Sequence, residues 1–160
     1  MTAPARLHYH LLWPVRGGAA GSVLTPEALD LLPSYVARYA QTLGTTVGAV
    51  GGRGDHLHVV ADVPPDRQLA KVNEELRRAA ARFLRATLSI GGFDWDDAAQ
   101  VLSTVSSAER PDLIQYVLEQ EARHAEGGLF PEWEGGEDFE AGAGAEAAMP
   151  DWLREVLPRI

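Results

Sequence analysis

Cysteine is absent from the 160-residue sequence, and so are long apolar runs. The first absence excludes disulfide bonds, thiolate metal ligands and cysteine nucleophiles. No apolar run approaches the roughly 20 residues of a membrane-spanning helix. The amino terminus, "MTAPARLHYHLLW", has no secretory hydrophobic segment followed by a small-residue cleavage site. These absences predict a cytoplasmic protein without a membrane partner.

Positive charge is scarce, and its distribution is uneven. The formal net charge is −9. Residues 1–92 contain 10 basic and 7 acidic side chains, whereas residues 93–160 contain 4 and 16. The overall charge disfavours nucleic acid as a partner. Binding depends on local potential, however, and the first part of the chain is mildly basic.

Apolar periodicity and turn residues predict an alternation of strands and helices. The strands are expected at 6–13, 45–52, 55–63 and 100–106, and the helices at 26–43, 67–88 and 108–125. This order predicts an α+β fold, a ferredoxin-like antiparallel sheet with helices on one face. We expect a break or kink at Pro33 and a helix cap at Asp66. Residues 1–134 would form the domain, and residues 135–160 an acidic linker with a short C-terminal helix.

Two histidines, His56 and His58, lie two residues apart in the third expected strand, in "GDHLHVV". Side chains at this spacing leave the same face of a strand, so a cation could bridge them. The pattern alone does not decide between a metal site and packed strand residues, because His8 and His10 have the same spacing. Asp55 is expected to point to the opposite face.

A tyrosine and a glutamine lie one turn apart on the last expected helix, in "IQYVLEQ". Tyr116 could be a covalent nucleophile if a metal ion polarised the group that it attacks. Gln120 offers a neutral oxygen as a third metal ligand. The alternative is that Tyr116 is a core aromatic residue with a buried ring.

The order of these motifs resembles the single-tyrosine HUH transposases of the insertion-sequence 200/605 type, especially the repeat-associated tyrosine transposases. HUH stands for histidine, hydrophobic residue, histidine, which His56-Leu57-His58 matches. Further similar segments are "YHLLW", "GGRGDHLHVVADVPP", "FDWDD", "STVSS", "IQYVLEQEARH" and "LFPEWE". The resemblance extends from about Arg6 to Glu134, so it implies a transposase-like catalytic domain over residues 1–134.

The resemblance implies a metal-dependent endonuclease and strand transferase that acts on single-stranded DNA. His56, His58 and Gln120 would bind one Mg²⁺ or Mn²⁺. Tyr116 would attack a scissile phosphate and form a 5′-phosphotyrosine with a free 3′-hydroxyl. Similar proteins are homodimers that recognise a DNA hairpin, and Tyr116 could act with the histidines of its own chain or of a partner.

Positive charge for DNA contacts is expected on the second helix. Four basic residues share roughly one face of it: Lys71, Arg78, Arg82 and Arg85. The alternative is a solvated helix face, since Glu74 and Glu75 lie nearby.

Acidic segments leave two other hypotheses open. The loop "PVRGGAAGS" has Arg16 as its single basic residue. The segment "FDWDDAAQ" contains three carboxylates that would repel phosphate near a DNA groove. One alternative is a domesticated relative that nicks or binds a chromosomal repeat. The other is an inactive DNA-binding or dimerisation module that retains the fold.

Overall fold

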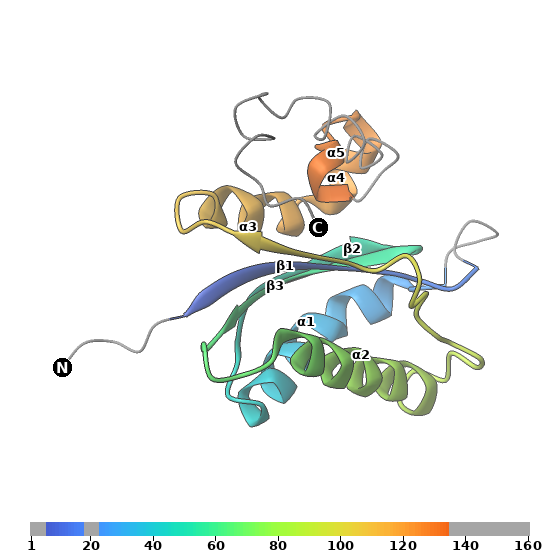
Figure 1. Ribbon diagram of the computed structural model, residues 1–160. Coiled ribbons are helices and arrows are strands. Elements are labelled where there is room, and N and C mark those ends of the chain that lie inside the picture. Colours follow the sequence, from blue (N-terminus) through green and yellow to red (C-terminus); the bar gives the residue numbers. More distant parts are fainter. Residues whose placement is uncertain (1–5, 18–22, 135–160) are drawn as a thin grey trace, which may run out of the picture. The chain divides into compact units, whose positions relative to one another are not determined.

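The computed structural model describes residues 6–17 and 23–134 (Figure 1). The chain divides into two compact units, Met1–Gly128 and Leu129–Ile160. The described part of the second unit contains the short helix α5 (Pro131–Glu134). The predicted acidic linker and C-terminal helix of residues 135–160 lie outside the described residues, and the boundary after Glu134 remains a prediction.

The first unit is built around a four-stranded antiparallel sheet with the order β2-β3-β1-β4. The strands are β1 (Leu7–Pro14), β2 (Thr46–Arg53), β3 (His56–Val63) and β4 (Val101–Val105). A tight turn joins β2 to β3, and helices provide the other connections of the sheet. The predicted ferredoxin-like α+β fold is confirmed.

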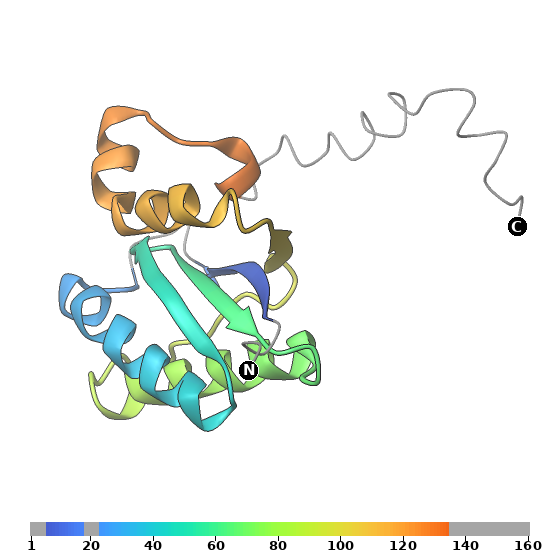
Figure 2. The same ribbon diagram turned by 90° about the vertical axis from the view of Figure 1, so that its left-hand side faces the viewer.

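Helices cover both faces of this sheet (Figures 1 and 2). The two helices that connect the strands, α1 (Pro26–Thr42) and α2 (Leu69–Ala86), lie together on one face, as predicted. The helices that follow the last strand, α3 (Arg110–Leu118) and α4 (Gln120–Glu126), cover the other face. None of the helices in the described ranges is both long and apolar enough to span a membrane.

Strand β3 is buried along its whole length, because it has a neighbouring strand on each side and helices on both faces. Its residues alternate between two environments, as the two-residue period of a strand requires. Leu57, Val59 and Ala61 belong to the apolar core that α1 and α2 cover. His58 and Asp62 instead contact residues of β1 and α3. His56 is two residues from His58 and shares its face of the strand. Both predicted histidine ligands therefore lie on the face that α3 and α4 cover.

The structure differs from three local predictions. Helix α1 has no break at Pro33, because Leu32 and Val36 are buried in the core and their packing offsets one missing hydrogen bond. Helix α2 begins after Gln68 instead of Asp66. The last predicted helix is two helices, which separate at Glu119, where φ is −100° and ψ is 18°.

Glycines in β2 allow α3 to approach the sheet closely. A Cβ atom added at Gly51 would overlap the backbone carbonyl oxygen of Val117 in α3. A Cβ at Gly48 would lie 2.6 Å from Nη2 of Arg110, which is the far end of a long side chain. Only at Gly51 would the backbone of the helix itself have to move.

Gly51→Ala is therefore expected to lower the free energy of unfolding by about 1–3 kcal/mol, the usual effect of overpacking. Gly91→Ala is the matched control, because a Cβ at Gly91 meets no atom within 4 Å. Chemical denaturation measures both changes. Equal stability of the two variants would contradict the close approach of α3 to β2.

Candidate active site

All five histidines of the chain lie on the side of the sheet that α3 and α4 cover. They are His8 and His10 in β1, His56 and His58 in β3, and His124 in α4. The register of β1 and β3 explains the four strand positions, because His8 lies opposite Asp62, and Leu12 opposite His58. Antiparallel pairing places such partners on the same face.

His58 is completely buried, and β1 orients its ring. Its Nδ1 lies 2.8 Å from Nε2 of His10, and the two rings stack with centroids 5.0 Å apart. When His58 Nδ1 donates to His10, the lone pair of His58 is on Nε2. A histidine that binds a metal ion typically donates its other ring N–H to such a partner.

His56 has the same kind of support from a carboxylate. Its Nδ1 lies 2.7 Å from Oδ1 of Asp55, so the prediction that Asp55 points away was wrong. Asp55 precedes β3, and strand alternation does not constrain it. Burial alone raises the pKa of Asp55, but the hydrogen bond and charge of His56 lower the pKa below its ordinary 3.8. The carboxylate accepts a hydrogen bond from Nδ1–H, so that Nε2 is the ligand atom when the ring is neutral.

Gln120 brings α4 to the same histidine. Its Oε1 lies 3.1 Å from Nε2 of His56 and 3.1 Å from Nε2 of His124. The Gln120 side chain is almost fully buried, and its Nε2 is 3.4 Å from the backbone oxygen of Tyr116. One amide oxygen and two imidazole nitrogens therefore converge from β3 and α4.

Tyr116 lies beside the predicted metal ligands and is 0% exposed. Its ring centroid is 6.1 Å from that of His58, in an edge-on arrangement. The guanidinium carbon of Arg123 lies 4.9 Å from the centre of the Tyr116 ring. The structure brings Tyr116, His56, His58 and Gln120 together, as the sequence predicts, but it also encloses the tyrosine completely.

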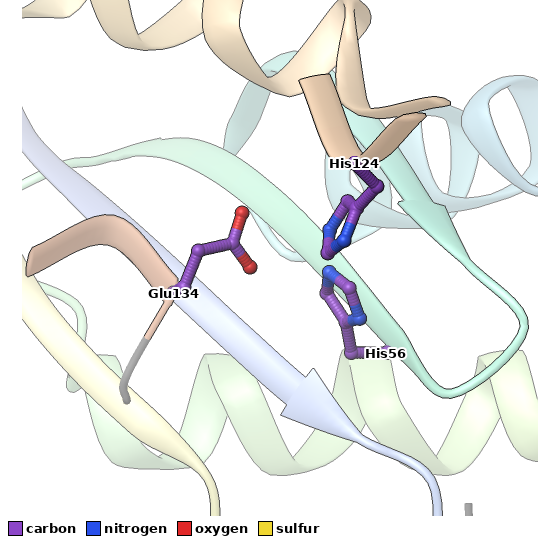
Figure 3. Close-up of side chains that lie close together, drawn as sticks. All are labelled: His56, His124 and Glu134. Atoms are coloured by element: carbon purple, nitrogen blue, oxygen red, sulfur yellow. The ribbon is translucent and has the colours of Figure 1, made fainter. Parts of the chain in front are cut away.

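His56 and His124 offer nitrogen atoms that could hold a metal ion together. These atoms lie within 4.8 Å of each other, and Figure 3 shows the two imidazoles facing one another from β3 and α4. Glu134, also drawn in Figure 3, belongs to the second unit, so the site consists of residues of the first unit only. Hydrogen bonds at Nδ1 orient the rings of His56 and His58. Imidazole nitrogens beside an amide oxygen suit a divalent transition-metal ion.

An ion pair holds the helix of Tyr116 on the sheet. Asp62 in β3 accepts from Nη2 of Arg110 in α3 at 2.7 Å and from its Nε at 3.0 Å, and His8 Nδ1 lies 2.6 Å away. Burial alone raises the pKa of Asp62, but the hydrogen bonds and charges of Arg110 and His8 hold the pKa below its ordinary 3.8.

Because the folded-state pKa of Asp62 is lowered, its carboxylate stabilises the fold above the unfolded-state pKa and loses this effect as pH falls through the folded-state pKa. Asp62→Asn is expected to lower the free energy of unfolding by about 1–3 kcal/mol at pH 7. The difference from the parent should narrow below about pH 4, where a protonated Asp62 resembles asparagine. Denaturation at several pH values tests this, with Glu74→Gln of the exposed Glu74–Arg78 pair as control. A difference that does not vary with pH would contradict the prediction.

The predicted basic stripe is exposed but lies elsewhere. Lys71, Arg78, Arg82 and Arg85 belong to α2, on the face of the sheet opposite the histidines. Arg78 pairs with Glu74, and Arg85 donates to the backbone oxygen of Phe93. A DNA strand that contacts both the stripe and Tyr116 would have to pass around the sheet, and the role of the stripe remains a prediction.

Arginines pair with two of the three carboxylates in the acidic segment "FDWDD". Asp94 lies 3.0 Å from Arg16, and Asp97 2.7 Å from Arg77. The buried Trp95 anchors the segment by donating from its indole nitrogen to the backbone oxygen of Arg77. These pairs reduce the repulsion of phosphate that the sequence alone predicts.

The family model described as "Transposase IS200 like" matches residues 4–120. The chain belongs to the IS200-like transposase family. The match ends at Gln120 and includes the HUH pair and Tyr116. No curated protein matches the chain.

Two solved structures share the fold of this IS200-like transposase. One is a candidate transposase from Deinococcus radiodurans, with 24% identity and a TM-score of 0.56, covering 75% of this chain and 95% of the other. The second is a REP-associated tyrosine transposase bound to a REP hairpin, with 9% identity and a TM-score of 0.55, covering 78% and 72%. At these identities the likeness concerns the fold.

Sequence reasoning missed two histidines of this IS200-like transposase. Spacing alone gives His10 no more weight than His8, yet His10 contacts His58. No sequence motif indicates a role for His124, although it follows Gln120 by four residues, the spacing of one helical turn. The signals in the sequence are the "LHYH" pattern and the four-residue spacing. They indicate site residues only when β1 is paired with β3 and α4 is packed beside them.

Proposed function

We propose that this IS200-like transposase is a metal-dependent endonuclease and strand transferase for single-stranded DNA that acts through a 5′-phosphotyrosine. The observation that carries the proposal is the convergence of Tyr116 and Gln120 with the HUH pair on one face of the sheet. Membership of the transposase family supports it.

The residue roles follow from the chemistry of each group. The phenolic oxygen of Tyr116 attacks the scissile phosphorus, a P–O bond to tyrosine forms, and the bond to the 3′-oxygen breaks. The phenol loses its proton, and the leaving 3′-oxygen gains a proton to become a hydroxyl group. His56, His58 and Gln120 would hold one Mg²⁺ or Mn²⁺, which supplies polarisation of the phosphate and stabilises developing charge. Attack by another 3′-hydroxyl reverses the step and joins strands.

The proposed partner is a DNA hairpin with an adjoining single strand, and the proposed assembly is a homodimer. A fold relative is bound to a REP hairpin, which supports this class of DNA. The basic residues of α2 would contact phosphates at a distance from the cleavage site. We also propose that the protein acts in the cytoplasm.

The second candidate function is a DNA-binding or dimerisation module without catalysis, derived from a transposase. The complete burial of Tyr116 favours it, because an attacking oxygen must reach a phosphate. If the enzyme is active, DNA binding must displace the side chains that enclose Tyr116.

A covalent-adduct assay separates the two candidates. Single-stranded hairpin DNAs with 3′-terminal labels are incubated with the full chain and Mn²⁺, and a labelled protein band is sought under denaturing conditions. We expect a covalent adduct that does not form in the presence of a chelator. Protease digestion should lower the apparent mass of the labelled band. Salt-dependent binding without an adduct, across a library of hairpins, would overturn the enzyme and support the binding module.

A further inference from the structure

His124 is the one histidine of α4, and it lies in the site without a role in the reaction proposed above. Its Nε2 is 3.1 Å from the Gln120 oxygen, and its ring centroid is 5.0 Å from that of His56. The His124 side chain is partly buried, so an ion bound there would be partly shielded from solvent. The spacing of Gln120 and His124 presents both side chains from adjacent turns of α4.

The contact between His56 and Gln120 depends on which ring nitrogen of His56 carries hydrogen. When Nδ1–H of a neutral His56 donates a hydrogen bond to Asp55, the Nε2 lone pair is directed at the oxygen of Gln120. An amide oxygen only accepts, so two lone pairs would face each other at 3.1 Å. The contact is favourable with a second proton on the ring, with the Gln120 amide reversed so that its nitrogen donates, or with a metal ion in contact with both residues. His124 contacts the same oxygen and would be drawn to the same cation.

We propose that His124 is a further ligand of the metal centre, where its Nε2 would bind the same ion as Nε2 of His56 and the amide oxygen of Gln120. The inference rests on the metal centre of the proposed function and adds one residue to it. Imidazole nitrogen favours later first-row transition metals, whereas Mg²⁺ prefers oxygen ligands and water. The centre therefore selects Co²⁺ over Mn²⁺ and Mg²⁺, and His124 contributes to this selectivity.

Metal binding without DNA tests the inference on the full chain. Calorimetric titrations with Mg²⁺, Mn²⁺ and Co²⁺ compare the parent with His124→Ala and His124→Gln, and the visible absorption of Co²⁺ reports its ligands. Glu126→Ala is the matched control, since Glu126 is an exposed residue of the same helix. Circular dichroism verifies that each variant is folded.

We expect both His124 variants to lose about tenfold or more in Co²⁺ affinity and to change the Co²⁺ spectrum. Their Mg²⁺ affinity should change much less, because imidazole contributes little to Mg²⁺ binding. Glu126→Ala should behave as the parent. Unchanged Co²⁺ affinity and spectrum in folded His124 variants would overturn the inference while leaving the proposed function intact. A parent protein that binds none of the three ions would overturn the proposed metal centre itself.

Discussion

Tyr116→Phe is expected to reduce the covalent protein–DNA adduct by roughly 10³-fold or more, because phenylalanine has no oxygen to attack phosphorus. The fold should persist. The phenylalanine ring fills the same completely buried position and keeps its contact with the guanidinium of Arg123. Labelled hairpin DNA with Mn²⁺ measures the adduct, and thermal unfolding verifies the fold.

A second tyrosine provides the control for this experiment. Tyr39 lies in α1, on the opposite side of the sheet from the histidines. Tyr39→Phe removes the same hydroxyl group from a partly buried tyrosine and should leave the adduct unchanged. An adduct that persists in Tyr116→Phe would assign the nucleophile to another residue.

His58→Ala is expected to weaken Mn²⁺ binding by about tenfold to a hundredfold and to remove the adduct with it. His58 is the completely buried member of the HUH pair, and its ring lies between those of His10 and Tyr116. Calorimetric titration measures the affinity. His8→Ala is the matched control, because His8 occupies the same face of the sheet but contacts Asp62 and Ser107. Equal Mn²⁺ affinity in the two variants would contradict the predicted ligand role of His58.

A mixture of His58→Ala and Tyr116→Phe protomers tests which chain supplies the tyrosine. In the structure Tyr116 lies beside His58 of the same chain. If this pairing is used in the reaction, neither protomer of a mixed dimer has a complete site, and no adduct should form. Recovery of the adduct on mixing would show that the partner's histidines act with Tyr116.

The sequence predicts the fold well because its main signals are local. Apolar alternation and the turn at Gly54 are sufficient to define β2, β3 and their pairing. The split at Glu119 was not predictable, because the helical spacing of apolar residues continues across it. The end of α3 depends on tertiary packing, because this helix lies directly against Gly48 and Gly51 of β2.

The site was predictable in part for the same reason. His56 and His58 follow a strand period, and Gln120 follows Tyr116 by one helical turn, so each pair is visible in the sequence. Contacts between the pairs, such as His56 with Gln120, depend on the tertiary packing of residues 64 positions apart. The supporting role of His10 also depends on it, because the pairing of β1 with β3 brings His10 to His58. Asp55 contacts its neighbour in the sequence, but strand alternation does not predict that contact.

The burial of β3 on both faces has a consequence for amide hydrogen exchange. Its amides, between two neighbouring strands, should exchange only when the whole unit unfolds. The short helices α3 and α4 pack on one face only and can open at a lower free energy. His56 and His58 would then stay in place while the helices that carry Tyr116, Gln120 and His124 detach and return. Exchange measured with and without Mn²⁺ should show new protection in α3 and α4 and little change in β3.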